Sequence, residues 1–406
     1  MGVCGVESRW QARRKLSFWR GAKVIPDCRR SRPIIAGHLL RPSAMNGTFE
    51  QARNFFLDGL AHYQAGRFPQ AETSLAASLA LLPGRASTLT NLGATRLKLG
   101  RAQEALELLD EALAQEPVNV EALGHRAAAL AELGRRDDAL ACLQRVLGLQ
   151  PELGHAWSLR GSLLQEAGRM EEAAASFEQA LAHGGDPELN RYYLAGLRGG
   201  ITPAAPPRHY VENLFDGYAG QFDAHLQALN YQVPALLAQG LPQGRRFKAA
   251  LDLGCGTGQC APLLRPWAAA LDGVDLSSNM LAQAGTLKLY RSLVQADLAD
   301  HLATTPQRYD LVVAADVFIY VGALDAAFAG VARVIEAGGV FCCSVEEAGQ
   351  GHDLQLQPSL RYAHSEGYLR ALAQQHGMEV TQVQRGAVRE DQRVAIPGLF
   401  AWLVRP

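Results

Sequence analysis

A 34-residue repeat occupies most of the first half of the chain and constrains its fold more than any other feature. Glycine, alanine and proline each recur at this spacing. The three series are Gly66, Gly100, Gly134 and Gly168; Ala71, Ala105, Ala139 and Ala173; and Pro83, Pro117 and Pro151. A fixed period of this length is typical of a solenoid, in which stacked helix pairs bury their apolar faces against one another. We therefore predict four helix pairs over residues 52–187.

The residue types at the repeated positions indicate how each pair folds. Small residues at positions 59, 93, 127 and 161 let two helices approach closely, the glycine seven residues later ends the first helix, and the proline closes the unit. This pattern resembles the tetratricopeptide repeat. An unrelated Ala- and Leu-rich bundle is the alternative, but it does not explain a register kept through four copies. The resemblance implies a groove that binds a protein or peptide.

The segment after the repeats marks a change of architecture. We expect residues 187–198 to form a capping helix that completes a repeat domain over residues 45–200. Two glycines and three prolines in RGGITPAAPPRHY then break any helix, which predicts a linker at 201–212. Short apolar segments alternate with helical segments over the remaining residues, 213–406. This alternation predicts an α/β fold with a largely parallel, doubly wound, Rossmann-like sheet that binds its ligand beyond the carboxyl ends of the strands. The expected strands are 247–254, 269–276, 292–298, 309–320 and 338–346.

A glycine-rich loop, GCGTG, follows the first of these strands and carries the most specific motif in the chain. A dinucleotide fingerprint is excluded because Gln259 stands where that fingerprint requires its third glycine. The sequence LDLGCGTG instead resembles motif I of class I S-adenosylmethionine-dependent methyltransferases, and the resemblance covers residues 208–406. With the repeats included, the chain resembles bacterial methyltransferases that contain tetratricopeptide repeats. An enzyme is therefore expected, which transfers a methyl group from S-adenosylmethionine to an N or O acceptor on a partner recruited by the repeats.

The resemblance implies a role for individual residues of the second half. Asp275, which ends the second strand, would accept the ribose hydroxyls, and Asp297 would meet the adenine. The alternative for both aspartates is capping of the helices that follow them. Asp316 ends the fourth strand and would lie near the transferred methyl group. The complete predicted cofactor-binding set is Asp252, Gly254, Cys255, Gly256, Gly258, Asp275, Leu276, Asp297, Leu298, Asp316, Val317 and Tyr218.

Two further segments flank the predicted cofactor site. Residues 213–234 contain four aromatic residues, and a segment of this kind covers the cofactor in similar methyltransferases; the alternative is an amphipathic helix packed on the sheet. Tyr218 and Phe222 are the candidates for this lid. His364 and Glu346 are candidate proton acceptors, which an amine or hydroxyl acceptor requires and a carboxylate does not. A lone histidine, however, is more often structural.

Charge and composition narrow the expected partners. The net charge of −1 is a cancellation, because residues 1–44 carry +8 and the remainder −9. An acidic body argues against a nucleic-acid partner. No apolar segment approaches the roughly 20 residues of a membrane span, so we expect a cytoplasmic protein without a membrane partner. The seven cysteines show no zinc-like spacing, and we expect no metal.

The basic leader, residues 1–44, has three interpretations. It is a transit peptide, an arm that binds nucleic acid or membrane, or sequence upstream of a start at Met45, and we favour the last. Two other functions of the whole chain also stay open. One is a small-molecule methyltransferase whose repeats mediate oligomerisation, and the other is a scaffold without catalysis.

Overall fold

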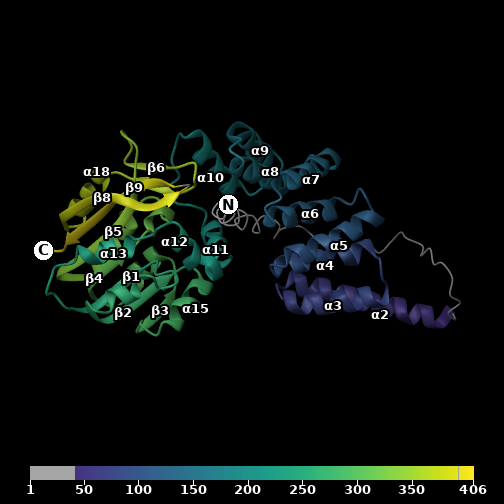
Figure 1. Ribbon diagram of the computed structural model, residues 1–406, viewed down its shortest axis with the longest axis horizontal. Helices are drawn as coiled ribbons and strands as arrows, with labels where there is room; N and C mark the ends of the chain where they lie inside the picture. The colour runs from purple at the N-terminus through teal and green to yellow at the C-terminus, as the bar shows by residue number, and fades with distance from the viewer. Residues whose placement is uncertain (1–41, 392) are drawn as a thin grey trace. The chain divides into compact units, whose positions relative to one another are not determined.

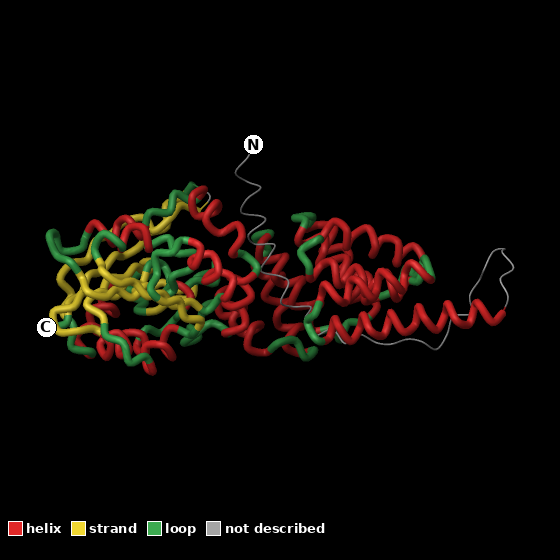
Figure 2. Tube along the Cα trace, turned by 90° about the horizontal axis from the view of Figure 1, so that it is seen from below, coloured by secondary structure: helices red, strands yellow, loops and turns green. Residues whose placement is uncertain are grey.

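The computed structural model describes residues 42–391 and 393–406 (Figure 1). The basic leader therefore lies almost wholly outside the described residues, and so does the choice among its three interpretations. The chain divides into two compact units, Met1–Asn190 and Arg191–Pro406. Strands are confined to the second unit, whereas the described part of the first is built of helices and loops (Figure 2). The two predicted fold classes are thus both present, in the predicted order.

The first unit consists of four stacked helix pairs. A glycine with positive φ follows the first helix of each pair, as predicted, at Gly66, Gly100, Gly134 and Gly168 (φ 72–76°). The pairs are in close contact where the sequence has small residues: a Cβ on Gly161 would lie 2.7 Å from a ring carbon of Phe177. The pairs are α2 (Pro42–Gln64) with α3 (Phe68–Leu81), α4 (Ala86–Lys98) with α5 (Ala102–Gln115), α6 (Val120–Glu132) with α7 (Arg136–Leu149), and α8 (Gly154–Glu166) with α9 (Met170–Ala182).

The boundary between the units falls within helix α10 (Pro187–Arg198), the expected capping helix. Tyr192 and Tyr193 are each only 2% exposed, and both rings pack against Tyr210 of the second unit. The Tyr192 hydroxyl donates a hydrogen bond of 2.9 Å to the Leu360 carbonyl. The second half of α10 therefore contributes to the core of the second unit. The predicted extent of the repeat domain, 45–200, stays a prediction.

The second unit is built on a mostly parallel sheet with the order β3-β2-β1-β4-β5. The C-terminal strand β9 (Val394–Val404) pairs antiparallel with both β5 and β8 (Glu379–Asp391). Of two short strands, β7 (Tyr362–His364) pairs parallel with the carboxyl end of β5, and β6 (Leu354–Leu356) pairs antiparallel with β7. The five parallel strands are β1 (Phe247–Leu253), β2 (Ala268–Asp275), β3 (Ser292–Gln295), β4 (Tyr309–Ala314) and β5 (Ile335–Glu347).

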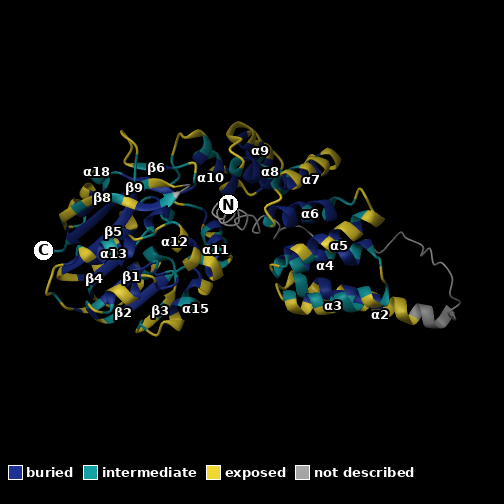
Figure 3. Cartoon of the chain, in the orientation of Figure 1, coloured by how far each residue is buried: buried dark blue, intermediate teal, exposed yellow. Residues whose placement is uncertain are grey.

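Helices cover the sheet and bury its apolar residues (Figure 3). Those between and after the parallel strands are α14 (Ala261–Leu264), α15 (Ser278–Thr286), α16 (Leu298–Thr304), α17 (Asp325–Val334) and α18 (Glu366–Gln375). Before the first strand, α11 (Arg208–Asp216), the short 3₁₀ turn η2 (Ala219–Gln221), α12 (Phe222–Ala228) and α13 (Val233–Gln239) occupy the region of the predicted lid.

The fourth strand is shorter than predicted. We expected a strand over 309–320, but β4 ends at Ala314 and a 3₁₀ turn, η3 (Phe318–Tyr320), follows it. The reason is Asp316, whose φ of 56° is incompatible with an extended strand. The chain therefore leaves the sheet at the carboxyl edge, where parallel strands place their ligand-binding loops.

Candidate functional site

The glycine-rich loop after β1 depends on its glycines for its shape. Gly254, Gly256 and Gly258 all have positive φ, at 64°, 52° and 91°. A Cβ on Gly254 would overlap the Val317 side chain, and one on Gly258 would lie 2.7 Å from Leu287. The loop therefore tolerates no side chain at these two positions, because the protein packs directly against them.

Asp275 connects this loop to the end of β2. One carboxylate oxygen accepts the Gly256 N–H at 2.8 Å, and the other accepts the Ser277 N–H at 2.9 Å. Burial raises the pKa of Asp275, and these backbone N–H groups oppose that rise only in part. Ser277, rather than Asp275, caps α15, since its hydroxyl accepts the Met280 N–H. Asp275 thus holds the glycine loop in place, and Leu276 follows it half-buried.

Asp297 caps the helix that follows it, which is the alternative role that the sequence left open. Its carboxylate accepts the N–H groups of Ala299 and Asp300, at 2.8 and 3.2 Å, and caps α16. Leu298 packs partly buried against the core. A cap and a ligand contact use the same residue without conflict, because a carboxylate has about four acceptor sites. The adenine role of Asp297 and Leu298 stays a prediction.

Two buried residues stabilise the loop, Asp252 just before it and Cys255 within it. Asp252 is 1% exposed and accepts a hydrogen bond of 2.7 Å from the Tyr290 hydroxyl, and burial raises its pKa to about 7. Burial also raises the pKa of the Cys255 thiol, which keeps it protonated and unreactive. Both residues were predicted to belong to the cofactor site; Asp252 lies in β1 just before the loop, and Cys255 is a buried residue of the loop itself. Sequence reasoning missed Tyr290, which no motif marks.

The helices of the predicted lid are hydrogen-bonded to the same loop. The Thr257 hydroxyl donates to Asp223 of α12. The Ser277 hydroxyl donates to Asp216 of α11 at 2.6 Å, and the Asn279 side chain donates to the Asp216 carbonyl at 3.0 Å. The two aspartates therefore fix this segment to both ligand loops. Sequence reasoning identified the segment by its aromatic residues and missed these carboxylates.

The aromatic residues of the same segment pack among themselves and toward the end of β4. The Phe222 ring makes edge contacts with Phe215 and Tyr218, and Phe215 meets Tyr320 at 5.0 Å between ring centroids. The Tyr218 hydroxyl is hydrogen-bonded to the His225 ring. Phe222 is also the side chain nearest to Gly256: a Cβ there would lie 3.8 Å from its ring. Phe222 thus reaches the glycine loop, and both predicted lid residues are in the segment fixed to it.

A buried cluster of charges lies where β4 and β5 end. Arg389 of β8 donates to Asp316 at 2.9 Å and, through its other terminal nitrogen, to Glu346. The Asp316 N–H donates to the Ser344 hydroxyl at 2.8 Å, which supports its unusual φ. Arg361, also buried, donates to the Tyr320 hydroxyl at 3.4 Å. Two carboxylates and two guanidinium groups therefore meet at this edge, and the sequence had identified only the carboxylates.

His364 has the environment of a neutral, buried ring. It is fully buried in β7, donates through Nε2 to the Gly322 carbonyl at 2.6 Å, and stacks on Tyr368. Burial lowers its pKa to about 4. Glu346 and Asp316 therefore lie close together, because both bind Arg389, whereas His364 does not belong to this group. Both residues stay predictions as proton acceptors.

Comparison with known proteins agrees with these two halves. Models of the tetratricopeptide repeat match residues 56–120, 96–163 and 154–182, and a model described as a methyltransferase domain matches residues 251–343. The chain combines tetratricopeptide repeats with a methyltransferase domain. This confirms the resemblance on which the sequence-based prediction rested.

The curated relatives match this chain in part. A malonyl-[acyl-carrier protein] O-methyltransferase of Geobacter sulfurreducens is 32% identical over 38% of this chain and 59% of its own length. Human methyltransferase-like protein 27 is 34% identical over 27% of this chain and 44% of its own. The chain spans about half the length of the curated relatives it matches. Among solved structures, an N-methyltransferase of Bradyrhizobium japonicum is 16% identical with a TM-score of 0.35, covering 46% of this chain and 87% of that one.

Two features of the described residues concern membranes and metal ions. Within residues 42–391 and 393–406, no helix is long and apolar enough to cross a membrane. The same residues contain no group of three side chains suited to hold a metal ion. The cytoplasmic location and the exclusion of nucleic-acid and membrane partners stay predictions.

Proposed function

We propose that the methyltransferase domain binds S-adenosylmethionine and transfers its methyl group to an N or O acceptor, and that the repeats recruit the protein that carries this acceptor. The observation that carries the proposal is the joint geometry of the glycine loop and Asp275. Three glycines with positive φ bring the backbone close to the edge of the sheet, and a buried carboxylate fixes that loop beside the end of β2. This is the arrangement that a ribose-bearing cofactor requires.

The residues present fit this cofactor. A Cβ on Gly256 would meet only the Phe222 ring, at 3.8 Å, so the loop has space beside it at this position. Asp275 supplies a carboxylate for the ribose hydroxyls, and Asp297 with Leu298 would bind the adenine. Leu276, Val317 and Tyr218 complete the proposed binding set. Asp252 and Cys255 shape the loop rather than providing reactive groups.

The cofactor, when bound, supplies an electrophilic methyl group on a sulfonium. Since the displacement is in line, the main task of the protein is to align the acceptor. Asp316, which is held by Arg389 at the end of β4, lies at the proposed acceptor position. The burial of this cluster excludes water from the reacting groups.

The acceptor decides whether a base is needed. A carboxylate acceptor needs none, whereas an amine or hydroxyl must lose a proton, and the proposed proton acceptors are Glu346 and His364. His364, with its pKa lowered to about 4, is neutral at pH 7 and carries a buried Nδ1 that has no hydrogen-bond partner among the described residues. The relative named malonyl-[acyl-carrier protein] O-methyltransferase supports testing oxygen acceptors first.

The first experiment is calorimetric titration of the full chain with S-adenosylmethionine. We expect saturable binding, at least tenfold weaker in Asp275→Ala because the loop and the ribose contact are lost together. Asp58→Ala, an exposed carboxylate of the repeats, is the control and should bind as wild type. No binding by the wild type would refute the enzyme proposal and leave the scaffold function. Unchanged affinity in Asp275→Ala would refute the site.

A second experiment addresses the role of the repeats. Proteins that the full chain captures are incubated with the full chain and with methyl-labelled S-adenosylmethionine. The measurement is which molecules receive the labelled methyl group. Label on a captured protein supports recruitment of a protein acceptor. Label only on small molecules, together with a self-associated chain, would instead favour a small-molecule methyltransferase whose repeats mediate oligomerisation.

A further inference from the structure

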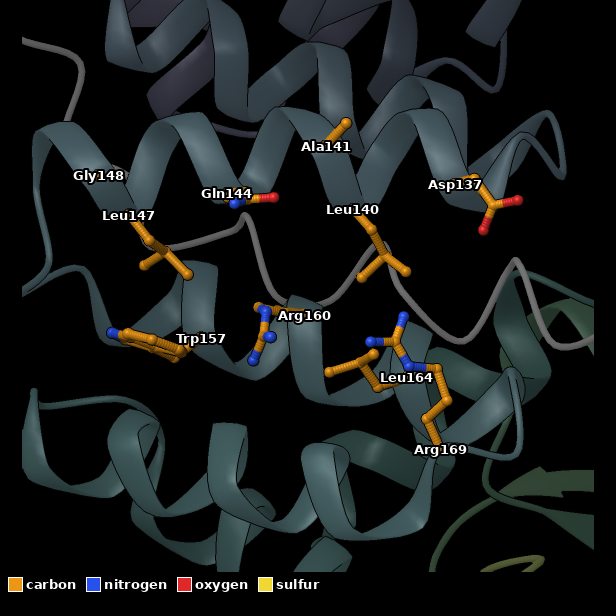
Figure 4. Close-up of a pocket in the computed structure, with 10 residues that line it drawn as sticks. All are labelled: Asp137, Leu140, Ala141, Gln144, Leu147, Gly148, Trp157, Arg160, Leu164 and Arg169. Carbon is orange, nitrogen blue, oxygen red and sulfur yellow. The ribbon is translucent and has the colours of Figure 1, made fainter.

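The repeat unit contains a pocket of about 540 Å³ between α7 and α8 (Figure 4). Its apolar lining comes from both helices, and the guanidinium groups of Arg160 and Arg169 lie at its α8 side. The Arg160 guanidinium lies 5.6 Å from the centre of the Trp157 ring. The apolar side chains in the lining are Leu140, Leu147, Trp157 and Leu164. The pocket thus combines an apolar surface with the cations of Arg160 and Arg169, and the Asp137 carboxylate lies on its α7 side.

The repeat provides an internal reference for Arg160. The residue 34 positions earlier is Arg126, which bonds the Cys142 sulfur and forms an ion pair of 2.6 Å with Asp110. Arg160 makes the first contact in the same way, by donating to the hydroxyl of Ser176, which is the counterpart of Cys142. It lacks the second contact, because Gln144 stands at the position of Asp110.

The missing carboxylate leaves a difference in electrostatics between two equivalent arginines. Burial lowers the pKa of Arg126, but its interactions with Asp110 and Cys142 together more than compensate, and the net pKa is raised. Burial also lowers the pKa of Arg160. The charge of Glu172 opposes this decrease and the charge of Arg169 adds to it, and the net pKa is lowered. Among the described residues, Arg160 has no ion pair within 4 Å, whereas Arg169 is paired with Glu172 at 2.6 Å.

The α7 side of the pocket is also more open than the equivalent surface one repeat earlier. Ala141 and Gly148 stand where the preceding repeat has Glu107 and Ala114. Nothing lies within 4 Å of a Cβ placed on Gly148. The residues of α7 that differ from the preceding repeat therefore both remove the carboxylate partner of Arg160 and leave space beside it.

We propose that this pocket binds a peptide segment of a protein partner in which an acidic side chain lies beside a large apolar one. The carboxylate takes the place of the missing Asp110 equivalent against Arg160, and the apolar side chain lies against Leu140, Leu147 and Trp157. A charge-assisted hydrogen bond to a partly buried guanidinium is strong and directional. The inference rests on the proposed protein-binding role of the repeats and is independent of methyl transfer.

The test uses random linear peptides displayed on phage and selected on the full chain. We expect enrichment of peptides with Asp or Glu beside a large apolar residue. Gln144→Asp restores the ion pair of the preceding repeat and keeps the fold, so it should weaken the selected peptides at least about tenfold by competing for Arg160. Arg160→Gln should do the same by removing the cation.

Gln103→Asp is the matched control, because it adds the same charge to an exposed position of the preceding repeat and should leave binding unchanged. Selected peptides that bind Gln144→Asp as tightly as wild type would overturn the pocket while the protein-binding role of the repeats stands. Failure to enrich any peptide would overturn both. Neither outcome affects the methyltransferase proposal, which the titration with S-adenosylmethionine tests separately.

Discussion

Arg389→Gln is the most informative single change in the second unit, because this arginine bonds two buried carboxylates. Its side chain is 3% exposed, and those of Asp316 and Glu346 are 12% and 8% exposed. The variant leaves both carboxylates without the cation that compensates for their burial. Removing one partner from a buried ion pair typically costs about 3–5 kcal/mol. The charge of Arg361 also stabilises ionised Asp316 and offsets part of this cost. We therefore expect the free energy of unfolding to fall by about 3 kcal/mol at pH 7.

The loss should depend on pH. Burial raises the pKa of Asp316, Arg389 opposes that rise, and Glu346 adds to it. Without Arg389 the folded-state pKa of Asp316 lies still higher above its unfolded value. The destabilisation is then complete above the raised pKa and decreases as the pH falls toward the unfolded value near 4. The gap between variant and wild type should therefore narrow from pH 7 to pH 5.

Hydrogen exchange of the full chain measures this free energy locally, in peptides from β5 and β9. Arg385→Gln is the matched control, because Arg385 lies on the same strand and its ion pairs with Glu347 and Glu366 are exposed and screened. We expect little change for the control. A loss below about 1 kcal/mol in Arg389→Gln, or one that does not vary with pH, would refute this account of the cluster.

Three other predictions address different parts of the chain. Gly254→Ala should abolish titratable binding of S-adenosylmethionine with an unchanged circular-dichroism spectrum, since its Cβ meets Val317 at a positive φ; normal binding would contradict the loop assignment. The free energy of unfolding of the wild-type second unit should fall by as much as about 3 kcal/mol between pH 7 and pH 4. The reason is that the pKa of His364 is lowered to about 4 in the folded state, so the folded ring binds a proton at lower pH than the unfolded ring does. Measured by hydrogen exchange, the free energy of unfolding of His364→Gln should depend less on pH than that of the wild type. An equal dependence would exclude His364 as the cause. Gly161→Val should destabilise the repeat unit by about 1–3 kcal/mol through contact with Phe177 and leave cofactor titration unchanged; loss of cofactor binding would contradict the assignment of the cofactor site to the second unit alone.

The parts of the site that sequence reasoning found are those encoded by local patterns. Gly254 and Gly258 were recognisable because their positive φ is required within one short turn. Asp275 was recognisable because it ends an apolar segment beside that turn. Asp216 and Asp223 were missed because their hydrogen bonds reach the ligand loops 61 and 34 residues away.

Arg389 illustrates the same limit more strongly. It meets Asp316 across 73 positions of the chain, through a strand order in which β8 pairs with β9 and β9 with β5. No pattern within the sequence around it distinguishes it from Arg385, which is exposed on the same strand. His364 shows the converse, because the sequence marked it as a candidate base and the tertiary structure buries it against Gly322.

The two folds, the glycine loop and the carboxylate beside it can be predicted from the amino-acid sequence, since each follows from spacing and from the conformations that glycine alone adopts readily. Which charges meet depends on how distant segments pack against one another. Arg389 joins Asp316 and Glu346 because antiparallel strands bring distant segments together, and Arg160 lacks a carboxylate because α7 presents Gln144 to α8 where α5 presents Asp110 to α6. Charge compensation depends on distances of a few ångströms between elements, and those distances are set by packing rather than by any local pattern.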